Sequence, residues 1–167
     1  MFLRASLLVA VAAAQSGPWP TTEPHYPHYP TRLVTTLTGT WAFGEAGNKT
    51  DATAITYAEI VTPSTTPVPF SFDIAPPGIK GPRGTVFFRS THNCTKGARA
   101  LARFYAVNFY ARVFADGVEL GNHTAGPYTP FAFVLPACAA SGQRELALVV
   151  NNEFNKTLSP TATVRDQ

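Results

Sequence analysis

The chain has 167 residues, of which 45% are hydrophobic and 14% charged, and its formal net charge is +3 at pH 7. This length and apolar content are enough for one domain with one buried core. The charge is too weak for a nucleic-acid-binding protein, because no cluster of Lys or Arg is interleaved with exposed aromatic residues. We therefore expect a single folded domain without a nucleic-acid partner.

Residues 1–14 have the features of a signal peptide. Arg4 supplies a short positive region, Ala5 to Ala13 form an apolar stretch too short to span a bilayer, and small residues precede Gln15 as in a cleavage site. The sequence therefore predicts export, no membrane anchor and a mature chain that starts near Gln15. Secretion and a lumenal site such as a lysosome-like or vacuolar compartment both fit, and a buried N-terminal helix is the alternative.

Residues 15–32 form a proline-rich segment with the near-repeat Pro24-His25-Tyr26-Pro27-His28-Tyr29-Pro30. Prolines lack the N–H that a sheet needs and favour the polyproline II conformation. We expect an extended leader that lies outside the sheet. A metal-binding tail of His and Tyr is the weaker alternative.

Residues 33–167 are predicted to form the β domain. The first strands are expected at Leu37 to Phe43 and, with a weaker pattern, at Ile55 to Ile60. Val68 to Ile74 is expected to be a loop and turn before a strand at Thr85 to His92.

The run from Arg103 to Phe133 is the most informative part of the chain. Ala111 to Ala115 combines small, β-branched and aromatic residues, as a strand buried on at least one face requires. Asp116-Gly117 then supplies the positive φ angles of a type I′ turn, so Val118 to Leu120 is predicted to fold straight back as the second strand of a hairpin.

Apolar residues alternate with other residues in two later segments, Phe131 to Leu135 and Glu145 to Val150. Outside the signal-like region, no run of ten or more residues carries the spacing of an amphipathic helix with a cap. The sequence therefore predicts an all-β fold, an antiparallel jelly-roll or galactose-binding-like β-sandwich.

Four N-glycosylation sequons are present, each with Thr in the third position, and their asparagines are Asn48, Asn93, Asn122 and Asn155. Attached glycans would need surface positions on an exported protein. We expect at least two sites to be occupied. The alternative is that Asn and Thr are simply common in the loops of a β protein.

Two cysteines, Cys94 and Cys138, are an even number in a chain predicted to be exported, so one disulfide that closes a long loop is expected. Two free buried thiols are the alternative. No C-x-x-C spacing is present and the histidines are scattered, so no metal site and no cofactor are predicted. These histidines are His25, His28, His92 and His123.

Several motifs together resemble the N-terminal sugar-binding domain of glycoside hydrolase family 2, and most closely its β-glucuronidase branch. Leu37 to Phe43 is similar to the pattern L-x-G-x-W-x-F, and Arg103 to Gly117 is similar to R-F-x-A-V-N-Y-x-A-x-V-W-x-N-G. Leu120 to His123 resembles L-G-x-H, and Tyr128 to Phe131 matches Y-T-P-F. The resemblance implies a jelly-roll domain that binds sugar.

The resemblance covers about Leu37 to Leu158, and the family pattern continues with further strands. It therefore implies a domain that is C-terminally incomplete, in a fragment of a longer chain. Within the matched region, His123 to Tyr128 is one residue longer than the family pattern H-x-G-G-Y and carries Pro127 in place of a Gly. Because Pro cannot adopt positive φ, we expect a different local loop.

Glycoside cleavage needs two carboxylates on opposite sides of the scissile bond. In the family both are glutamates on a later barrel domain, and no segment here resembles their motifs. Asp116 is explained by the turn and Glu119 by an exposed strand face, so no catalytic residue is predicted in this chain.

Sugar rings often stack on aromatic side chains. Trp41, Phe43 and Phe114 lie within strand patterns and are expected to be in the core. Tyr110 and Tyr128 are the two candidate sugar-binding residues, with a core position as the alternative for each.

The resemblance implies the sugar-binding and scaffold domain of a secreted β-glucuronidase-like enzyme of carbohydrate metabolism, which hydrolyses O-glycosyl bonds with catalytic groups outside this chain. Its partners would be a glycoside and the downstream domains of the same polypeptide, and the chain alone would be inactive. The alternatives are a stand-alone secreted lectin-like module, which needs a complete and self-covered sandwich, and a secreted structural glycoprotein.

Overall fold

The computed structural model describes the backbone of residues 5–9 and, with side chains, residues 33–47, 51–70, 83–124, 126 and 128–153. No α-helix occurs in these ranges, and the one short 3₁₀ helix, η1, spans Tyr57–Glu59. The strands are β1 Ala5–Val9, β2 Leu33–Thr36, β3 Gly39–Glu45, β4 Ser64–Val68, β5 Thr85–Asn93, β6 Ala100–Phe104, β7 Tyr110–Ala115, β8 Val118–His123, β9 Phe131–Leu135 and β10 Gln143–Asn151. The predicted all-β fold is confirmed.

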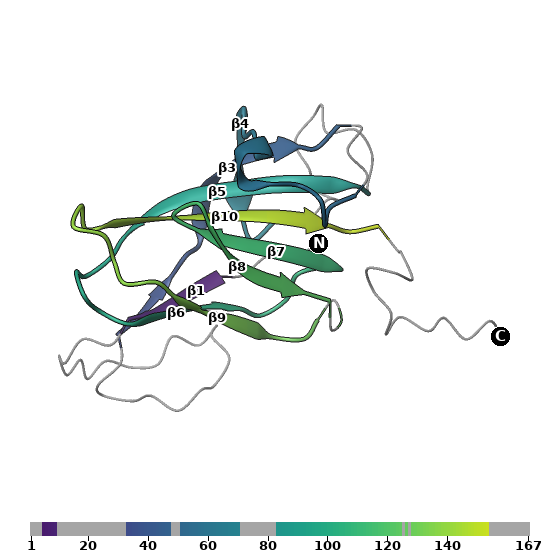
Figure 1. Cartoon of the computed structure of the whole chain (residues 1–167). Coiled ribbons are helices and arrows are strands. Elements are labelled where there is room, and N and C mark those ends of the chain that lie inside the picture. The colour runs from purple at the N-terminus through teal and green to yellow at the C-terminus, as the bar shows by residue number, and fades with distance from the viewer. Residues whose placement is uncertain are drawn as a thin grey trace.

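The strands form two antiparallel sheets (Figure 1). One sheet has four strands in the order β2-β1-β6-β9, and the other has six in the order β4-β3-β5-β10-β7-β8. Every pairing is antiparallel. This is the open sandwich that the alternating residue pattern predicts.

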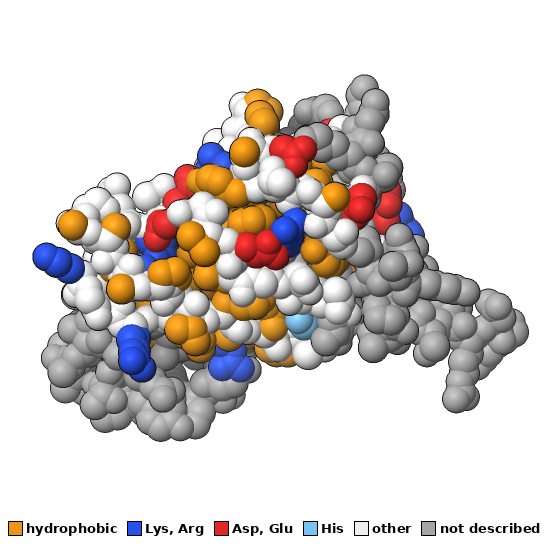
Figure 2. Space-filling model, viewed as in Figure 1, with side chains coloured by type: hydrophobic (Ala, Val, Ile, Leu, Met, Phe, Trp, Pro, Cys, Tyr) orange, Lys and Arg blue, Asp and Glu red, His pale blue; other side chains and the backbone are white. Residues whose placement is uncertain are grey.

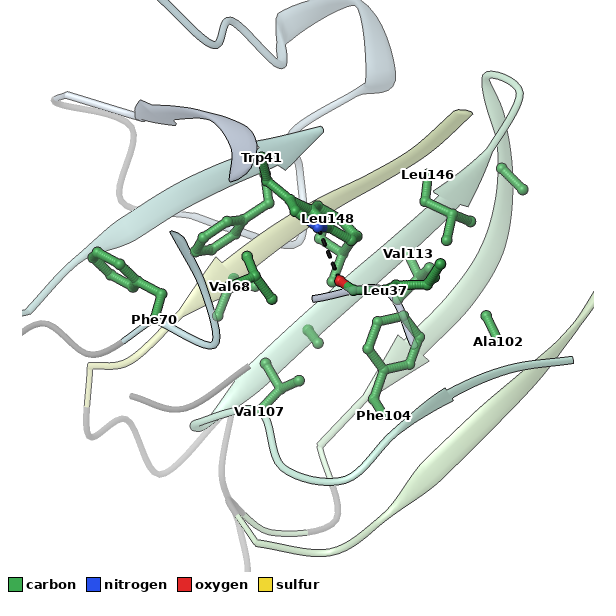
Figure 3. Packing of buried hydrophobic residues seen from close by; sticks show 14 of the residues in the cluster. Leu37, Trp41, Val68, Phe70, Ala102, Phe104, Val107, Val113, Leu146 and Leu148 are labelled. Atoms are coloured by element: carbon green, nitrogen blue, oxygen red, sulfur yellow. Dashed lines mark hydrogen bonds between the residues drawn. The ribbon is translucent and has the colours of Figure 1, made fainter. Parts of the chain in front are cut away.

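The main hydrophobic core fills the space between the sheets. Trp41 of β3 is 1% exposed, and its indole N–H donates a hydrogen bond to the carbonyl oxygen of Leu37 at 3.1 Å (Figure 3). Phe104 of β6 and Leu148 of β10 contribute buried side chains from the two sheets. The buried indole therefore has its one donor satisfied, as a core Trp requires. The predicted core positions of Trp41, Phe43 and Phe114 are confirmed.

A second, smaller core covers the outer face of the six-stranded sheet. Ala147 and Val149 of β10 are buried there, together with Phe114 of β7. The side chains of Ile55 and Ile60 cover them from the segment 51–60. Both faces of β10 are therefore buried, although its sequence alternates as if one face met solvent.

The predicted strand at Ile55 to Ile60 is wrong. Thr56 and Glu59 form a capping box at the start of η1, where the Glu59 carboxylate accepts hydrogen bonds of 2.8 Å from the Thr56 N–H and hydroxyl. These local bonds satisfy backbone groups that a strand would pair with a neighbour. Ile55 and Ile60 serve as apolar anchors of a loop and do not belong to a ladder.

Strand β4 was not predicted. Its last residue is Val68, the residue at which the sequence predicts the beginning of a loop. Of the predicted loop Val68 to Ile74, residues 71–74 lie outside the described residues. β4 lies at an edge of its sheet and pairs with one strand only. Pro67 lacks a backbone N–H, but at this edge no second strand needs that donor. The opening strand also begins at Gly39, two residues later than expected.

The predicted hairpin is confirmed and is longer than expected. β7 pairs with β8 through a turn in which Asp116 has φ 50° and Gly117 has φ 82°, both positive as a type I′ turn requires. β8 continues to His123, and the register shifts between Val113 and Phe114, which is a β-bulge.

Residues 5–9 form β1, in the interior of the four-stranded sheet. The alternative of an N-terminal helix is wrong for these five residues, and the signal peptide stays a prediction. The predicted leader at 15–32, with His25 and His28, and the segment 154–167 lie outside the described residues. In the described part of the chain, no helix is long and apolar enough to cross a bilayer.

Candidate functional site

Polar side chains gather on the outer face of the six-stranded sheet, beside the segment 51–60. Oη of Tyr57 donates a hydrogen bond to Oε1 of Glu145 at 2.5 Å. Nε of Arg89 lies 3.6 Å from the same carboxylate oxygen, and the Arg89 guanidinium carbon lies 4.9 Å from the centre of the Tyr57 ring. The hydrogen bond to Glu145, together with burial, raises the pKa of Tyr57. This carboxylate is therefore already engaged by a phenol and a guanidinium.

Asp116 fixes the β7–β8 turn to β10. Its Oδ1 accepts a hydrogen bond from the backbone N–H of Glu145 at 2.8 Å, and its Oδ2 accepts one from Nε of Arg144 at 3.3 Å. Arg144 is only 1% exposed and also donates to the carbonyl oxygen of Pro136. The predicted turn role of Asp116 is confirmed, and its charge is matched by a buried arginine.

Arg112 joins the segment 51–60 to the sheet. Its guanidinium donates to the carbonyl oxygens of Thr53 at 2.6 Å and Ile55 at 2.7 Å, and it forms an ion pair of 2.5 Å with Glu119. Hydrogen bonding to Arg112 lowers the pKa of Glu119. A glycosidase acid needs the opposite, a raised pKa. The contacts of Arg112 hold the segment 51–60 against the sheet. Figure 2 shows acidic and basic side chains interspersed among hydrophobic ones on this face.

We expect the variant Tyr57→Phe to lower the free energy of unfolding by about 1 kcal/mol, because it removes one hydrogen bond and keeps the ring against Phe114. Urea unfolding of the purified chain measures this change. Tyr128→Phe is the control, since that side chain is 74% exposed and should change stability by less than about 0.5 kcal/mol. Equal effects of the two variants would contradict the assigned role of Tyr57.

The two candidate sugar-binding tyrosines lie in different environments. Tyr110 is 2% exposed within the second core, and burial raises the pKa of its phenol. Its ring therefore offers no open face for stacking in this fold. Tyr128 follows β8 and is 74% exposed. Burial argues against Tyr110, and sugar binding by Tyr128 stays a prediction.

His123 is a residue whose role the sequence did not indicate. It is 8% exposed, its ring stacks on Phe131 with centroids 4.0 Å apart, and its Nε2 lies 3.2 Å from the carbonyl oxygen of Gly126. Burial lowers its pKa. The ring fastens the start of the β8–β9 loop to the sandwich. Pro127, where we expect a departure from the family loop, lies outside the described residues.

Stability is expected to fall as the pH decreases from about 6.5 toward 5. Burial lowers the pKa of both His92 and His123 in the folded chain. The unfolded state therefore binds protons first as the pH falls below the ordinary histidine pKa of about 6.5, and unfolding is favoured. Urea unfolding at pH 7.5 and 5.0 measures the loss, and His123→Gln should make it smaller. An unchanged pH dependence in that variant would contradict this assignment.

The predicted disulfide between Cys94 and Cys138 is present, with Cα atoms 5.9 Å apart. It joins the end of β5 to the segment between β9 and β10, and it excludes the alternative of two free thiols. Of the sequon asparagines, Asn93 and Asn122 are exposed, whereas Asn48 and Asn155 lie outside the described residues. Glycan occupancy stays a prediction.

The outer face of the four-stranded sheet carries a row of apolar side chains. Val34 of β2 and Leu101 of β6 both pair with Leu8 of β1, and Leu101 also pairs with Val134 of β9. Val34 is 46% exposed and Val134 is 71% exposed. The three residues therefore form an apolar row in which, within the described part of the chain, Val34 and Val134 are open to solvent and Leu101 is half-buried. Among the residues that the structure describes, no three His, Cys, Asp or Glu side chains come together as metal ligands would.

No known protein-family model matches the chain. Its fold is similar to that of several solved β-glucuronidases. A β-glucuronidase from an uncultured Clostridium species matches with a TM-score of 0.57 and 22% identity over 71% of this chain. The Ruminococcus gnavus enzyme in complex with D-glucaro-d-lactam matches with a TM-score of 0.57 and 20% identity over 81%.

The Bifidobacterium dentium β-glucuronidase complexed with coumarin-3-O-glucuronide matches with a TM-score of 0.56 and 24% identity over 72% of this chain. In all three comparisons, this chain covers only 20–24% of the solved chain. The chain therefore has the fold of one domain of these larger proteins.

Proposed function

We propose that this chain is the N-terminal sugar-binding and scaffold domain of a secreted β-glucuronidase-like enzyme of glycoside hydrolase family 2. The observation that carries the proposal is the match to β-glucuronidases, which covers 71–81% of this chain and 20–24% of theirs. The motifs around the β7–β8 hairpin support the same family. The parent enzyme would hydrolyse O-glycosyl bonds of glucuronides.

The acidic side chains on the described surface are consistent with a scaffold role. An arginine forms an ion pair with each of Asp116, Glu119 and Glu145, and the pKa of Glu119 is lowered. The two catalytic carboxylates of a glycosidase would therefore come from elsewhere in the polypeptide. The domain would pack against the catalytic domain of the parent polypeptide without taking part in bond cleavage.

The apolar row of Val34, Leu101 and Val134 supports contact with a further domain of the parent polypeptide. A lectin-like module that works alone would need to cover this face itself, and the described residues do not cover it. Export is supported by the signal-like residues 1–14, by the Cys94–Cys138 disulfide and by the exposed Asn93 and Asn122.

The proposal is tested by measuring activity on native protein captured from the source. Antibodies raised against the folded 167-residue chain would capture its parent from culture medium and from lysed cells. We expect the captured material to hydrolyse a chromogenic aryl β-D-glucuronide, and the 167-residue chain produced alone to be inactive. Capture in the presence of excess free chain is the control and should abolish the activity.

Captured protein without activity on either a glucuronide or a β-galactoside would contradict the proposal. If that protein also bound an immobilised glycan, the lectin-like alternative would replace it. Activity on the galactoside alone would keep the family and change the substrate.

A further inference from the structure

The sequon of Asn93 shares a residue with the disulfide. Asn93 is the last residue of β5, and Cys94, the middle residue of its sequon, is bonded to Cys138. Asn93 is exposed, and Gln143, directly opposite it on β10, is exposed too. A sugar attached to the side-chain amide of Asn93 would therefore extend into solvent, and the folded chain would carry it without losing the disulfide.

The backbone of the same sequon is engaged in the folded chain. Asn93 pairs with Gln143 in the ladder between β5 and β10, and the N–H of Cys94 donates a hydrogen bond to the carbonyl oxygen of Gly142 at 2.8 Å. A glycosyltransferase that reads the sequon must take all three of its residues into an acceptor site. The ladder opposes this, and the disulfide adds a covalent tie at the middle residue. The folded and oxidised chain is therefore closed to the transferase at Asn93.

The sequon of Asn122 has a different environment. Asn122 is exposed on the edge strand β8, opposite Arg112 of β7. Its middle residue is His123, which is held by ring stacking on Phe131 and by a polar contact with the carbonyl oxygen of Gly126. These contacts are not covalent, so Asn122 serves as an internal control that folding affects and disulfide closure does not affect directly.

The order of the chain limits the time that a transferase has at Asn93. Cys138 lies 44 residues after Cys94 and precedes β10, whose first residue is Gln143. At a synthesis rate of about 5–20 residues per second, Cys138 follows Cys94 after roughly 2–9 s. Disulfide formation takes seconds or longer, depending on the oxidant. The disulfide is thus able to close before β10 completes the ladder, and transfer competes with closure.

We propose that the glycan of Asn93 is added only before Cys94 pairs with Cys138, so that disulfide closure determines the fraction of exported chains that carry it. In the transfer, the amide nitrogen of Asn93 forms a bond to the anomeric carbon of the oligosaccharide, and the bond between that carbon and the diphosphate of a lipid donor breaks. The lipid diphosphate leaves with the bonding electrons, and the amide loses one proton to the transferase. In the closure, the two thiols lose two protons and two electrons to the disulfide of an oxidoreductase, which becomes a dithiol. This order requires export and does not depend on the proposed glycosidase function.

Site occupancy measured with and without a reducing agent tests the proposal. The 167-residue chain is placed behind an established signal sequence, so that entry does not depend on residues 1–14, and is translated with eukaryotic microsomes. Free thiols are alkylated, glycans are released by an amidase in heavy-oxygen water, and mass spectrometry gives the occupancy of Asn93 and Asn122. We expect partial occupancy of Asn93 in the natural chain. Dithiothreitol should raise it at least about twofold, because the time for transfer no longer ends within seconds of the synthesis of Cys138. The occupancy of Asn122 should change much less.

Two variants separate the disulfide from folding in general. Cys138→Ser should raise the occupancy of Asn93 without reductant, and reductant should then add nothing. Gly44→Ala destabilises the sheet, because its Cβ would meet the carbonyl oxygen of Val61, but it keeps both cysteines. It should leave the occupancy of Asn93 unchanged. Natural chains made without reductant that carry the Asn93 glycan should contain the disulfide as well.

Three results would overturn the proposal. One is an Asn93 that carries no glycan under any of these conditions. Another is an occupancy of Asn93 that neither dithiothreitol nor Cys138→Ser changes. The third is a rise that is equal at Asn93 and Asn122, or equal in Gly44→Ala and Cys138→Ser, which would assign the effect to slow folding. None of these results involves glucuronidase activity, so failure of the proposed function would be seen separately, in the captured parent protein.

Discussion

Replacing both Cys94 and Cys138 with serine should lower the free energy of unfolding by about 4 kcal/mol. The disulfide closes a loop with a sequence separation of 44 residues, and the chain-entropy relation gives this size of effect for such a loop. The loop contains β6, β7, β8 and β9, so the crosslink restricts strands of both sheets in the unfolded chain. The Cys94→Ser change keeps the sequon at Asn93, because any residue except Pro is accepted in the middle position.

Urea unfolding with and without a reducing agent measures this effect. Reduction should lower the stability of the natural chain to that of the double variant and should leave the double variant unchanged. The prediction would be contradicted if the natural chain were equally stable with and without reducing agent. A chain that unfolds on reduction at 25 °C would agree with it, since small domains are typically stable by only about 5–15 kcal/mol.

The variant Gly44→Ala should lower the free energy of unfolding by about 3 kcal/mol or more, through overpacking. Gly44 is buried in β3 opposite Phe87. A Cβ at this position would lie 1.9 Å from the carbonyl oxygen of Val61 and 3.1 Å from Cδ of Pro63. Because these obstacles are backbone and a proline ring, the segment that follows Ile60 would have to move away from the sheet.

Gly97→Ala is the matched control for Gly44→Ala. Gly97 has φ +73°, and a Cβ there would meet nothing within 4 Å. Only conformational strain of about 1–2 kcal/mol is expected from this change. Thermal and urea unfolding of both variants measure the difference. A Gly44→Ala variant as stable as Gly97→Ala would show that the segment after Ile60 does not pack on β3 as described.

Local sequence signals predicted a large part of the sandwich. The β7–β8 hairpin was predictable because the local preference of Asp116-Gly117 for positive φ angles favours a type I′ turn. Strands β9 and β10 were predictable from the period-2 alternation of their residues, and β5 was predictable from the β-branched and aromatic residues at its start.

The errors arose where distant parts of the chain determine the structure. Ile55 and Ile60 are apolar in either a strand or a covering loop, and only the sheet face beneath them decides between the two. Strand β1 was not predicted, because an apolar run such as Ala5–Val9 has the same composition in a signal peptide, which stays a prediction, and in an interior strand. Composition alone cannot separate these cases.

The polar cluster could not be predicted from the sequence either. Tyr57 and Glu145 are 88 residues apart and meet only because the segment 51–60 folds over β10. For the same reason Tyr110 lies in a core, although its side of β7 would otherwise face solvent. The surrounding sequence shows that Tyr110 is in a strand, but it does not show that a distant loop covers that strand.

The size of the native protein tests the central claim most directly. An antibody raised against Gly39 to Asp51 would be used on immunoblots of deglycosylated protein from the source medium and cells, because denaturation exposes this partly buried segment. A band several times heavier than 17.9 kDa is expected if the chain is one domain of a larger glycosidase. A band near 17.9 kDa as the only product would contradict the account, and a stand-alone glycan-binding module would then be the better explanation.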